Sequence, residues 1–366
     1  MHNAAAQKQT ASHGTRQIVL LGVGSAHLQL LAQLAAQPLA GTVVTLVAPQ
    51  SHPMVASMVP SLMVGRYTPD QCTIAVQPLV KRGGVRWIKQ GVIALDATNN
   101  TIQLDDGSNL HFDWLSVNTA PTQDRMQFEQ AIPGAKEHAL FVRPLESFSA
   151  LWPRVTEMGD TRPLRITVIG AGNGGIEIAF AVRERLPMAA VTLLGTQSPA
   201  AASGAPGLQQ RVMTLLKKHN ITILQDKAVA IKSGFVQLGC GADLACDIPL
   251  LAVGTLPPPW LANSGLALNE QGFIDVDTYQ RSRSHSHVFA SGDISSSKGA
   301  APARNLAAAA GGAQKVLAPA AALHLIACGS RYAVGSWKKY SFEGRWVWWP
   351  KDQIDRRFVA ANPSRG

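Results

Sequence analysis

Two stretches of the chain share one order of apolar and polar positions. Residues 17–34 (QIVLLGVGSAHLQLLAQL) and residues 165–182 (RITVIGAGNGGIEIAFAV) each begin with an apolar run, pass through a glycine turn and continue with helical spacing of apolar residues. A second apolar run follows in each copy, TVVTLVA in the first and AVTLLG in the second. Short apolar runs predict buried strands, and apolar positions three and four apart predict a helix packed on them. The pattern therefore predicts two βαβ units of one plan.

Each copy continues into short segments that alternate apolar and polar residues. In the first copy these are residues 93–121 (IALDATNNTIQLDDGSNLHFDWLSVNTAP), and in the second residues 230–257 (AIKSGFVQLGCGADLACDIPLLAVGTLP). Both end with an apolar strand that leads into a small-residue turn and a proline. We expect an α/β fold with two Rossmann-like dinucleotide-binding domains, each of three layers and carrying a β-meander, followed by an aromatic and basic C-terminal extension.

The glycine turn of the second copy has the complete G-x-G-x-x-G spacing. Gly170, Gly172 and Gly175 lie between a predicted strand and a predicted helix. The first glycine of this motif permits the tight turn, the second lets the backbone approach a pyrophosphate, and the third lets helix and strand pack closely. The helix N-terminus adds partial positive charge. This context predicts a dinucleotide site, and the alternative is a tight turn with a structural role alone.

The first copy departs from this spacing at one position. Gly22 and Gly24 match the first two glycines, but His27 stands at the third. A larger residue there moves the helix slightly from the strand without blocking the phosphate turn. We expect this turn to bind a dinucleotide as well, and the alternative is a degenerate copy.

Neither copy carries an acid at the end of its second strand, where the adenosine ribose hydroxyls are usually bound. The first copy ends in VAPQ, so that Gln50 offers at best an uncharged hydrogen bond. The second has Gly195 and Thr196 at this position, and no basic residue follows until Arg211. The sequence therefore predicts neither a strong NADH nor a strong NADPH preference.

Composition is compatible with two domains and an anionic partner. The chain has 366 residues, 46% of them hydrophobic, and a formal net charge of +10. A nucleotide phosphate or acidic lipid would suit this charge, and a merely basic, soluble surface is the alternative. Residues 1–16 are polar and are expected to form a disordered leader. No stretch reaches the roughly 18 apolar residues that a membrane span requires.

The cysteines, histidines and basic residues predict no further chemistry. Four scattered cysteines fit a reducing compartment. Cys240 and Cys246 are interpreted as small apolar residues, with a redox pair as the alternative. His285 and His287 have no carboxylate or cysteine cluster to complete a metal site, so no metal is expected. Outside the C-terminal segment, basic residues are not interleaved with aromatic ones, and no nucleic acid is expected as a partner.

A third element, SHVFASGDIS at residues 286–295, ends an apolar strand on a Gly-Asp pair. Together with VNTAP, LAVGTLP and the two glycine turns, it resembles the pyridine nucleotide–disulfide oxidoreductase superfamily, whose members bind FAD and NAD(P)H. Within it the chain is similar to the type II NADH dehydrogenase branch. Three segments resemble in particular the flavoprotein domain found fused to selenide, water dikinase, namely PMVASMVPSLMVGRY, IPGAKEHALFVRPLESF and SWKKYSFEGRWVWWPKDQIDRRF.

The resemblance implies a division of the chain and a set of site residues. Residues 17–150 with 268–330 would bind FAD, residues 151–267 would bind NAD(P)H, and residues 331–366 would form the extension. Glu177 matches an acid near the contact of nicotinamide and flavin; its alternative is a first-turn acid favoured by the helix dipole. Asp293 would bind the FAD ribityl chain. The remaining implied cofactor contacts are Gly22, Gly24, His27, Gln50, Thr119, Ala120 and Gly292 for FAD, and Gly170, Gly172, Gly175, Gly195 and Gly254 for NAD(P)H.

The implied activity is that of an FAD-dependent NAD(P)H:acceptor oxidoreductase. Hydride would pass from nicotinamide to flavin, and electrons would pass on to a quinone or small acceptor. Disulfide reductases of the superfamily use two cysteines after the first βαβ unit, where this chain has only Cys72, so no redox disulfide is expected. Two alternatives stay open: a flavin reductase linked to selenium metabolism, and a specialised or non-catalytic FAD-binding protein that has lost NAD(P)H binding.

The C-terminal segment raises a separate question. Residues 331–366 carry eight basic residues and three acids, together with four tryptophans. We expect a cytoplasmic protein. Tryptophan with basic residues is typical of a bilayer interface, and a peripheral position on the inner face of the membrane is one expectation for the segment. The other is that KYSFEGRWVW forms a strand, with Trp346 and Trp348 on one face, packed on the FAD domain or on a second copy in a homodimer. KDQIDRRF would then be a short helix.

Overall fold

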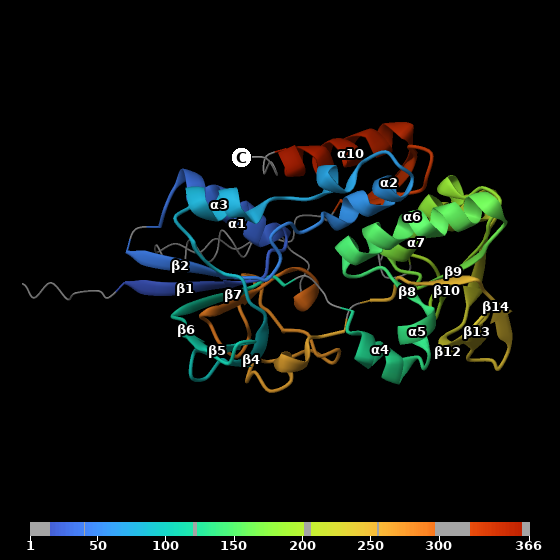
Figure 1. Cartoon of the computed structure of the whole chain (residues 1–366). Helices are drawn as coiled ribbons and strands as arrows, with labels where there is room; N and C mark the ends of the chain where they lie inside the picture. The colour runs from blue at the N-terminus through green and yellow to red at the C-terminus, as the bar shows by residue number, and fades with distance from the viewer. Residues whose placement is uncertain are drawn as a thin grey trace, which may run out of the picture. The chain divides into compact units, whose positions relative to one another are not determined.

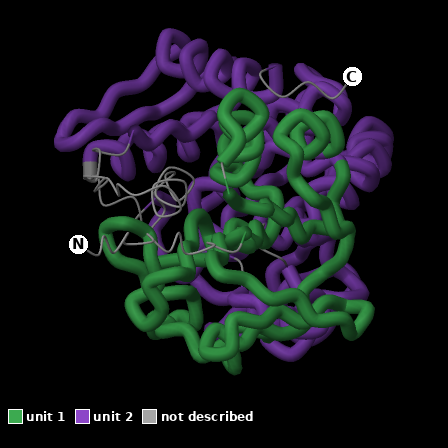
Figure 2. The backbone as a smooth tube through the Cα atoms, turned by 90° about the vertical axis from the view of Figure 1, so that its left-hand side faces the viewer, with its two compact units in different colours: residues 1–51, 77–120, 259–317 green, residues 52–76, 121–258, 318–366 purple. Residues whose placement is uncertain are grey.

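The computed structural model of the chain describes residues 15–39, 41–119, 123–200, 206–254, 256–296 and 323–360 (Figure 1). The chain divides into two compact units, shown in green and purple in Figure 2. Unit 1 comprises residues 1–51, 77–120 and 259–317. Unit 2 comprises residues 52–76, 121–258 and 318–366. Each unit contains one of the two glycine turns, as the duplication predicts.

Unit 1 is built on a parallel five-stranded sheet with the strand order β16-β7-β1-β2-β3. Its strands are β1 (Arg16–Leu21), β2 (Thr42–Val47), β3 (Arg86–Ile88), β7 (Trp114–Val117) and β16 (Val288–Ala290). An antiparallel meander of β4 (Val92–Asp96), β5 (Thr101–Leu104) and β6 (Asn109–His111) packs its apolar side chains into the same core. The helices are α1 (Ser25–Ala36), α3 (Val76–Arg82) and the short 3₁₀ turns η4 (Pro259–Leu261) and η5 (Gly292–Ile294).

Unit 2 repeats this plan with the strand order β11-β10-β9-β15-β8. Its strands are β8 (Leu140–Phe141), β9 (Arg165–Ile169), β10 (Ala190–Gly195), β11 (Ile221–Gln225) and β15 (Ile248–Leu251). The meander is β12 (Ala228–Lys232), β13 (Phe235–Leu238) and β14 (Asp243–Ala245). The helices are η1 (Ala56–Met58), α2 (Val59–Met63), η2 (Pro69–Cys72), α4 (Arg125–Ala131), α5 (Ala135–His138), α6 (Leu145–Thr161), α7 (Asn173–Arg185) and α8 (Pro206–Lys218).

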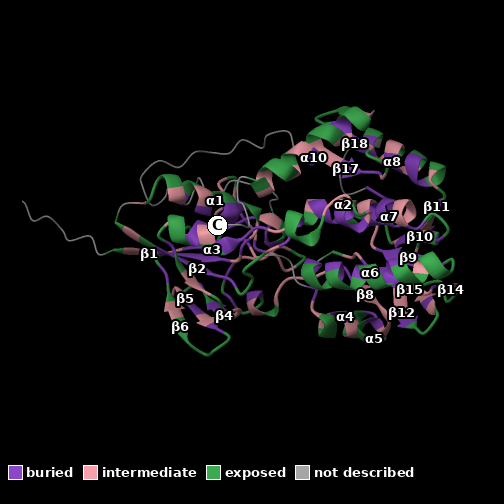
Figure 3. Cartoon of the chain, turned by 45° about the horizontal axis from the view of Figure 1, so that its top comes forward, coloured by how far each residue is buried: buried purple, intermediate pink, exposed green. Residues whose placement is uncertain are grey.

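The two sheets correspond strand for strand. In each, the strand before the glycine turn lies at the centre, parallel to the strand after the turn's helix and to the strand after the meander. Such central parallel strands are covered on both faces and read as continuous apolar runs. Figure 3 shows this pattern: the central strands are buried, and the outward faces of the helices are exposed. The α/β fold class with β-meanders that the sequence predicts is therefore present.

The boundaries of the units differ from those expected from the sequence. Residues 52–76 and 121–150 were expected in the first domain, but they belong to unit 2. Two contacts explain the difference: β8 pairs with β15 in the second sheet, and α2 and α6 pack with α7 in one apolar core. Residues 1–14, most of the expected leader, lie outside the described residues, and β1 already begins at Arg16.

The C-terminal segment is part of unit 2 and ends in a long helix. Three antiparallel strands, β17 (His324–Ala327), β18 (Ala333–Trp337) and β19 (Tyr340–Gly344), precede α10 (Arg345–Ala360). The expected strand over KYSFEGRWVW therefore stops at Gly344, and the tryptophans are helical. In a helix, the side chains of residues i and i+2 point about 200° apart around the axis. Trp346 is accordingly 64% exposed while Trp348 is half-buried, so the prediction that both share one face was wrong.

Candidate dinucleotide-binding sites

The first glycine turn lies against the end of β7. Gly22 has a φ of +86°, and a Cβ atom added there would lie 2.5 Å from Thr119 Cα. A Cβ atom added at Gly24 would lie 2.2 Å from Asn118 Oδ1. Both positions therefore need glycine because the neighbouring strand end approaches so closely. The turn that the sequence assigns to FAD is well formed.

Asn118 is the centre of this hydrogen-bonded group, although the sequence pattern does not single it out. Its Oδ1 accepts hydrogen bonds from the backbone N–H groups of Ala26 and His27, at 3.2 and 3.3 Å. Its Nδ2 donates to the carbonyl and hydroxyl oxygens of Ser291, at 2.9 and 3.0 Å. Asn118 thus ties α1 to the turn that leads into Gly292. Its position at a strand end within VNTAP was the signal available in the sequence.

The hydrogen bonds of Asn118 limit what the N-terminus of α1 can offer to a ligand. Ala26 and His27 already have acceptors for their N–H groups, and the N–H of Gly24 donates to the carbonyl of Asn118 at 3.0 Å. Ser25, the first residue of α1, is exposed, and its N–H and hydroxyl groups have no hydrogen-bond partner among the described residues. An anion at this turn would therefore be bound chiefly by the backbone and hydroxyl of Ser25.

His27 forms a buried brace rather than a ligand contact. Its Nδ1 lies 2.7 Å from the carbonyl oxygen of Gly22, and its Nε2 lies 2.8 Å from Ser116 Oγ. A carbonyl only accepts, so the proton is on Nδ1, and Nε2 accepts from the hydroxyl of Ser116. Burial lowers the pKa of His27 to about 4, although the bond to Gly22 opposes this shift. The neutral imidazole replaces the third glycine by hydrogen-bonding the turn to the sheet.

The other residues expected at this site differ in accessibility. Asp293, in η5, is exposed, and its carboxylate has no partner among the described residues. Gly292 lies beside Asn118, whose Nδ2 would be 3.0 Å from an added Cβ atom. Thr119 Oγ1 is buried with no hydrogen-bond partner in the described part of the chain. Gln50 is exposed after β2, and Ala120 lies outside the described residues.

The second glycine turn has the geometry that its spacing predicts. Gly170 has a φ of +124°, and an added Cβ atom would lie 2.5 Å from the carbonyl oxygen of Ala252. An added Cβ atom at Gly175 would lie 1.8 Å from the carbonyl oxygen of Gly170, so helix and strand are in close contact there. At Gly172, by contrast, nothing lies within 4 Å of such an atom. These are the turn, packing and ligand-approach positions of the motif.

The N-terminus of α7 is open. In the described residues the N–H groups of Asn173, Gly174 and Gly175 have no acceptor, and the first helical bond runs from Ile176 to Gly172. Three converging N–H groups at the positive end of a helix form an anion site. The second turn therefore offers more donors to a pyrophosphate than the first turn does.

The missing ribose acid has a structural cause. Gly195 is the last residue of β10, and an added Cβ atom would lie 2.5 Å from the Cβ atom of Ala171 in the glycine turn. A side chain at residue 195 would therefore displace the turn. Gly254, after β15, is exposed with nothing within 4 Å of an added Cβ atom. The walls of this site are backbone and small side chains.

Glu177 lies one turn into α7 with a side chain that is only 13% exposed. Its Oε1 accepts from the N–H of Ala327 at 2.8 Å and lies 3.6 Å from Lys351 Nζ. Lys351 also donates to the carbonyl of Ser57 at 3.1 Å and lies 3.3 Å from Asp355 Oδ2. In the sequence, Lys351 is one of eight basic residues in the C-terminal segment. The structure makes it the charged partner of Glu177.

The charges of this cluster shift both pKa values. Burial raises the pKa of Glu177, and the ammonium group of Lys351 only partly opposes that shift. Burial alone would lower the pKa of Lys351, but the carboxylates of Glu177 and Asp355 outweigh it, and the pKa lies above its ordinary value. Lys351 therefore stays charged, while Glu177 takes up a proton more readily than an exposed glutamate.

The described cysteines are free thiols in different surroundings. Cys240 is exposed, whereas Cys72, Cys246 and Cys328 are buried. Burial raises the pKa of Cys72 to about 12 and also raises that of Cys246, so both thiols stay protonated and unreactive.

No group of three or more His, Cys, Asp or Glu side chains in the described ranges is arranged to hold a metal ion. Within the same ranges, no helix has the length and apolarity needed to cross a membrane.

Comparison with known families agrees with this architecture. The model of the family described as "Pyridine nucleotide-disulphide oxidoreductase" matches residues 16–313, which include both glycine turns and the Gly-Asp pair. The chain belongs to this family. The predicted fold class, family and oxidoreductase class are thereby confirmed, and the family supports FAD and NAD(P)H as cofactors.

Two curated relatives of this oxidoreductase have quinone-related names. An alternative NAD(P)H-ubiquinone oxidoreductase C1 of Arabidopsis thaliana is 25% identical over 228 residues, covering 55% of this chain and 43% of the relative. A demethylphylloquinone reductase of Synechocystis is 24% identical over 226 residues, covering 59% of this chain and 55% of the relative. The matches thus span about half the length of these relatives. They support the type II NADH dehydrogenase-like branch.

Solved structures share the fold of this oxidoreductase over nearly its whole length. A sulfide:quinone oxidoreductase of Aquifex aeolicus is similar with a TM-score of 0.79 and 15% identity, covering 95% of this chain and 93% of that one. NDH2 of Plasmodium falciparum, solved in complex with NADH, is similar with a TM-score of 0.75 and 12% identity, covering 95% and 99%. At such identities the likeness concerns the fold.

Proposed function

We propose that this oxidoreductase is an FAD-dependent NAD(P)H:quinone oxidoreductase. The observation that carries the proposal is the open N-terminus of α7, where Asn173, Gly174 and Gly175 present unpaired N–H groups beside the accessible Gly172. A protein that had lost NAD(P)H binding would have no need of this cradle. The names of the two curated relatives support a quinone as the acceptor.

The two glycine turns fit two different nucleotides. We assign the first turn to FAD because the exposed carboxylate of Asp293 and the free hydroxyl of Ser25 accompany it in unit 1. A carboxylate is suited to ribityl hydroxyls, and a helix N-terminus to a pyrophosphate. We assign the second turn to NAD(P)H. Bound FAD supplies the acceptance of a hydride and the onward transfer of electrons.

The residues of the chain would bind the nicotinamide nucleotide and hold a proton. The N–H groups of Asn173, Gly174 and Gly175 would bind its pyrophosphate. Reduction of a quinone to a quinol takes up two protons, so the enzyme needs a proton source. Glu177 is suited to this role because burial raises its pKa, so that its carboxylate takes up a proton more readily than that of an exposed glutamate. Ala327 and Lys351 contact Oε1 and would orient the carboxyl group.

A quinone acceptor resides in a membrane, and the hairpin of β18 and β19 has the composition of a membrane-contacting surface. Its tip carries Trp337, Lys338, Lys339 and Tyr340; Trp337 is 48% exposed and Tyr340 61% exposed. Aromatic rings with adjacent lysines favour the headgroup region of an anionic bilayer. We propose that this tip docks the enzyme peripherally on the membrane.

Spectroscopy of the purified protein tests the redox function. Flavin absorption that bleaches on anaerobic addition of NADH or NADPH, and returns on addition of a short-chain quinone, is the expected result. Flavin that does not bleach would instead support the specialised FAD-binding protein. Flavin that bleaches but is reoxidised only by other acceptors would support a flavin reductase. Absence of flavin after reconstitution with FAD would overturn the assignment of the first turn.

Vesicle co-sedimentation tests the docking surface separately. Binding to vesicles containing anionic lipid, lost in a variant with Trp337→Ser and Lys339→Ser, is expected. The control variant Lys217→Ser removes an exposed lysine in the last turn of α8, outside the hairpin tip. Equal binding by the two variants would contradict a role for the tip.

A further inference from the structure

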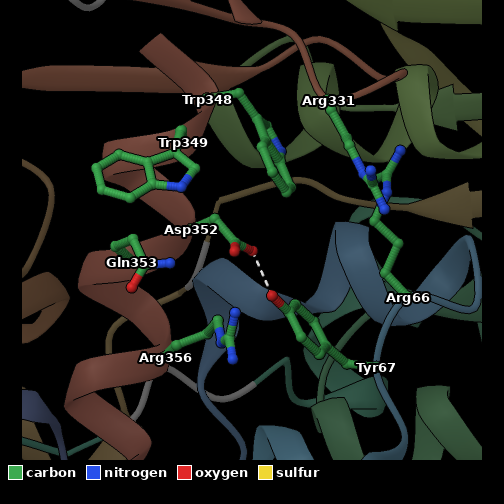
Figure 4. A pocket seen from close by; sticks show the side chains of 8 residues that line it. All are labelled: Arg66, Tyr67, Arg331, Trp348, Trp349, Asp352, Gln353 and Arg356. Atoms are coloured by element: carbon green, nitrogen blue, oxygen red, sulfur yellow. Dashed lines mark hydrogen bonds between the residues drawn. The ribbon is translucent and has the colours of Figure 1, made fainter. Parts of the chain in front are cut away.

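Unit 2 contains a cavity of about 320 Å3 that the redox function does not use (Figure 4). It lies between α10, the segment after α2 and the turn from β17 to β18. Three arginines and one aspartate line it together with three aromatic rings, so its charge is positive. The lining residues are Arg66, Tyr67, Arg331, Trp348, Trp349, Asp352, Gln353 and Arg356.

Arg331 is held in an unfavourable backbone conformation beside this cavity. Ser330 and Arg331 have φ values of +45° and +56°, in the left-handed region that residues with a side chain rarely adopt. The turn is closed by backbone bonds from Tyr332 to Gly329 and from Cys328 to Tyr332, both at 2.8 Å. The guanidinium carbon of Arg331 lies 5.9 Å from the centre of the Trp348 ring. Strained residues of this kind concentrate at ligand sites.

A second arginine reaches the same ring but is already neutralised. The guanidinium carbon of Arg66 lies 5.7 Å from the centre of the Trp348 ring, and Arg66 forms an ion pair with Glu184. The other carboxylate oxygen of Glu184 accepts from the N–H of Ser330 at 2.8 Å. Both carboxylate oxygens of Glu184 therefore have partners, one the guanidinium group of Arg66 and the other the N–H of Ser330. Arg331 has no carboxylate partner among the described residues.

Asp352, the one carboxylate that lines the cavity, also has a hydrogen-bond partner. Asp352 is buried and accepts a hydrogen bond from the hydroxyl of Tyr67, marked by the dashed line in Figure 4. Arg356, one turn further along α10, is exposed and has no ion pair in the described part of the chain. Two guanidinium groups, those of Arg331 and Arg356, therefore border the cavity without an ion-pair partner among the described residues. The lining keeps a net positive charge, although Asp352 retains its negative charge. Trp348 offers a flat aromatic surface beside Arg331.

We propose that this cavity binds a small organic anion with a flat conjugated ring, of the class of aromatic carboxylates. The ring would pack on Trp348, and the carboxylate would bind the guanidinium group of Arg331. Arg356 would raise the positive potential of the site. The volume lies at the lower end of the range for ligand pockets, about 300–1,000 Å3. An inorganic anion would leave the aromatic wall unused, and a neutral ring would leave both charges unpaired.

Isothermal titration calorimetry of the full chain with 2-naphthoate tests the proposal. We expect saturable binding to one site, and binding that is ~10-fold or more weaker for the uncharged 2-naphthamide and for inorganic phosphate. Arg331→Gln is expected to weaken 2-naphthoate binding ~10-fold, and Arg356→Gln by about threefold. Arg357→Gln is the matched control, because Arg357 is exposed on the same helix but does not line the cavity.

The outcomes separate the parts of the proposal. Loss of binding in Arg331→Gln, with normal binding in Arg357→Gln and unchanged melting temperatures, supports the site. Equal binding of 2-naphthoate and 2-naphthamide would overturn the anionic requirement, and phosphate binding as tight as 2-naphthoate would overturn the ring requirement. Absence of saturable binding, or equal affinity in the two arginine variants Arg331→Gln and Arg357→Gln, would overturn the site itself. None of these results depends on the redox activity.

Discussion

The carboxylate of Glu177 lies 3.6 Å from the ammonium group of Lys351. This contact joins the helix of the second glycine turn to the tryptophan-rich helix near the C-terminus of the chain. The two side chains are 13% and 11% exposed, so water screens their interaction only weakly. The C-terminal segment is therefore bound to the rest of unit 2 by a charge pair as well as by apolar packing.

Removing Lys351 should destabilise the protein strongly. In Lys351→Met the carboxylates of Glu177 and Asp355 lose their cation, and breaking a buried pair in this way costs about 3 kcal/mol in the free energy of unfolding. Urea denaturation near neutral pH measures it. The control Lys339→Met removes an exposed lysine of the hairpin tip and should change stability by less than about 0.5 kcal/mol. In the double variant with Glu177→Gln, the loss should be smaller than the sum of the single losses. Additive losses would contradict the pairing.

His27 should make stability depend on pH in a defined window. Its pKa is about 4 in the folded protein and near 6.5 in the unfolded chain. Below pH 6.5 the unfolded chain takes up a proton that the folded protein does not, so stability is lost as pH falls from 6.5 towards 4. The loss approaches about 3 kcal/mol. His27→Gln should lack this component, and His111→Gln, at an exposed position, should retain it. Unfolding free energies measured at several pH values decide between these outcomes; parallel curves for all three proteins would refute the brace.

Two glycines of the second turn should respond to alanine in opposite ways. Gly172 has a φ of −70° and open space around an added Cβ atom, so Gly172→Ala should fold with nearly unchanged stability. The methyl group would stand where the pyrophosphate approaches, and NADH binding should weaken ~10-fold or more. Gly175→Ala places a methyl group against the carbonyl of Gly170 and should cost about 2 kcal/mol of stability. Melting curves and NADH titrations together check both. A Gly172→Ala protein with normal NADH binding would contradict the proposed site.

Asn118 should control the retention of FAD. Asn118→Asp replaces the Nδ2 donor to Ser291 with an acceptor and adds negative charge at the N-terminus of α1, where we place the pyrophosphate. The protein should elute from gel filtration with most of its flavin lost, as read from the ratio of flavin to protein absorbance. Asn109→Asp, on the exposed edge of β6, adds the same charge elsewhere and should keep its flavin. Equal flavin content in the two variants would argue against the assignment.

The sequence predicted what local pattern determines. Apolar runs and glycine spacing located both βαβ units because these features act over a few residues. It could not show that the side chain of Asn118 occupies two N–H groups of α1, since residues distant along the chain meet there. The helix that contains Trp346 was mistaken for a strand because alternation over a few residues also occurs in helices. The partnership of Lys351 with Glu177 depends on where α10 packs, which no motif encodes.

The contact between Gly195 and Ala171 constrains how this enzyme could change its cofactor preference. A glutamate introduced at residue 195 would acquire the ribose contact only after the turn had made room for its Cβ atom, which would otherwise lie 2.5 Å from that of Ala171. Ala171→Gly removes this closest contact, leaves the backbone N of residue 171 at 3.0 Å, and would have to come first. The two substitutions are thus epistatic, and selection for tighter NADH binding has an ordered path of at least two steps at this strand end.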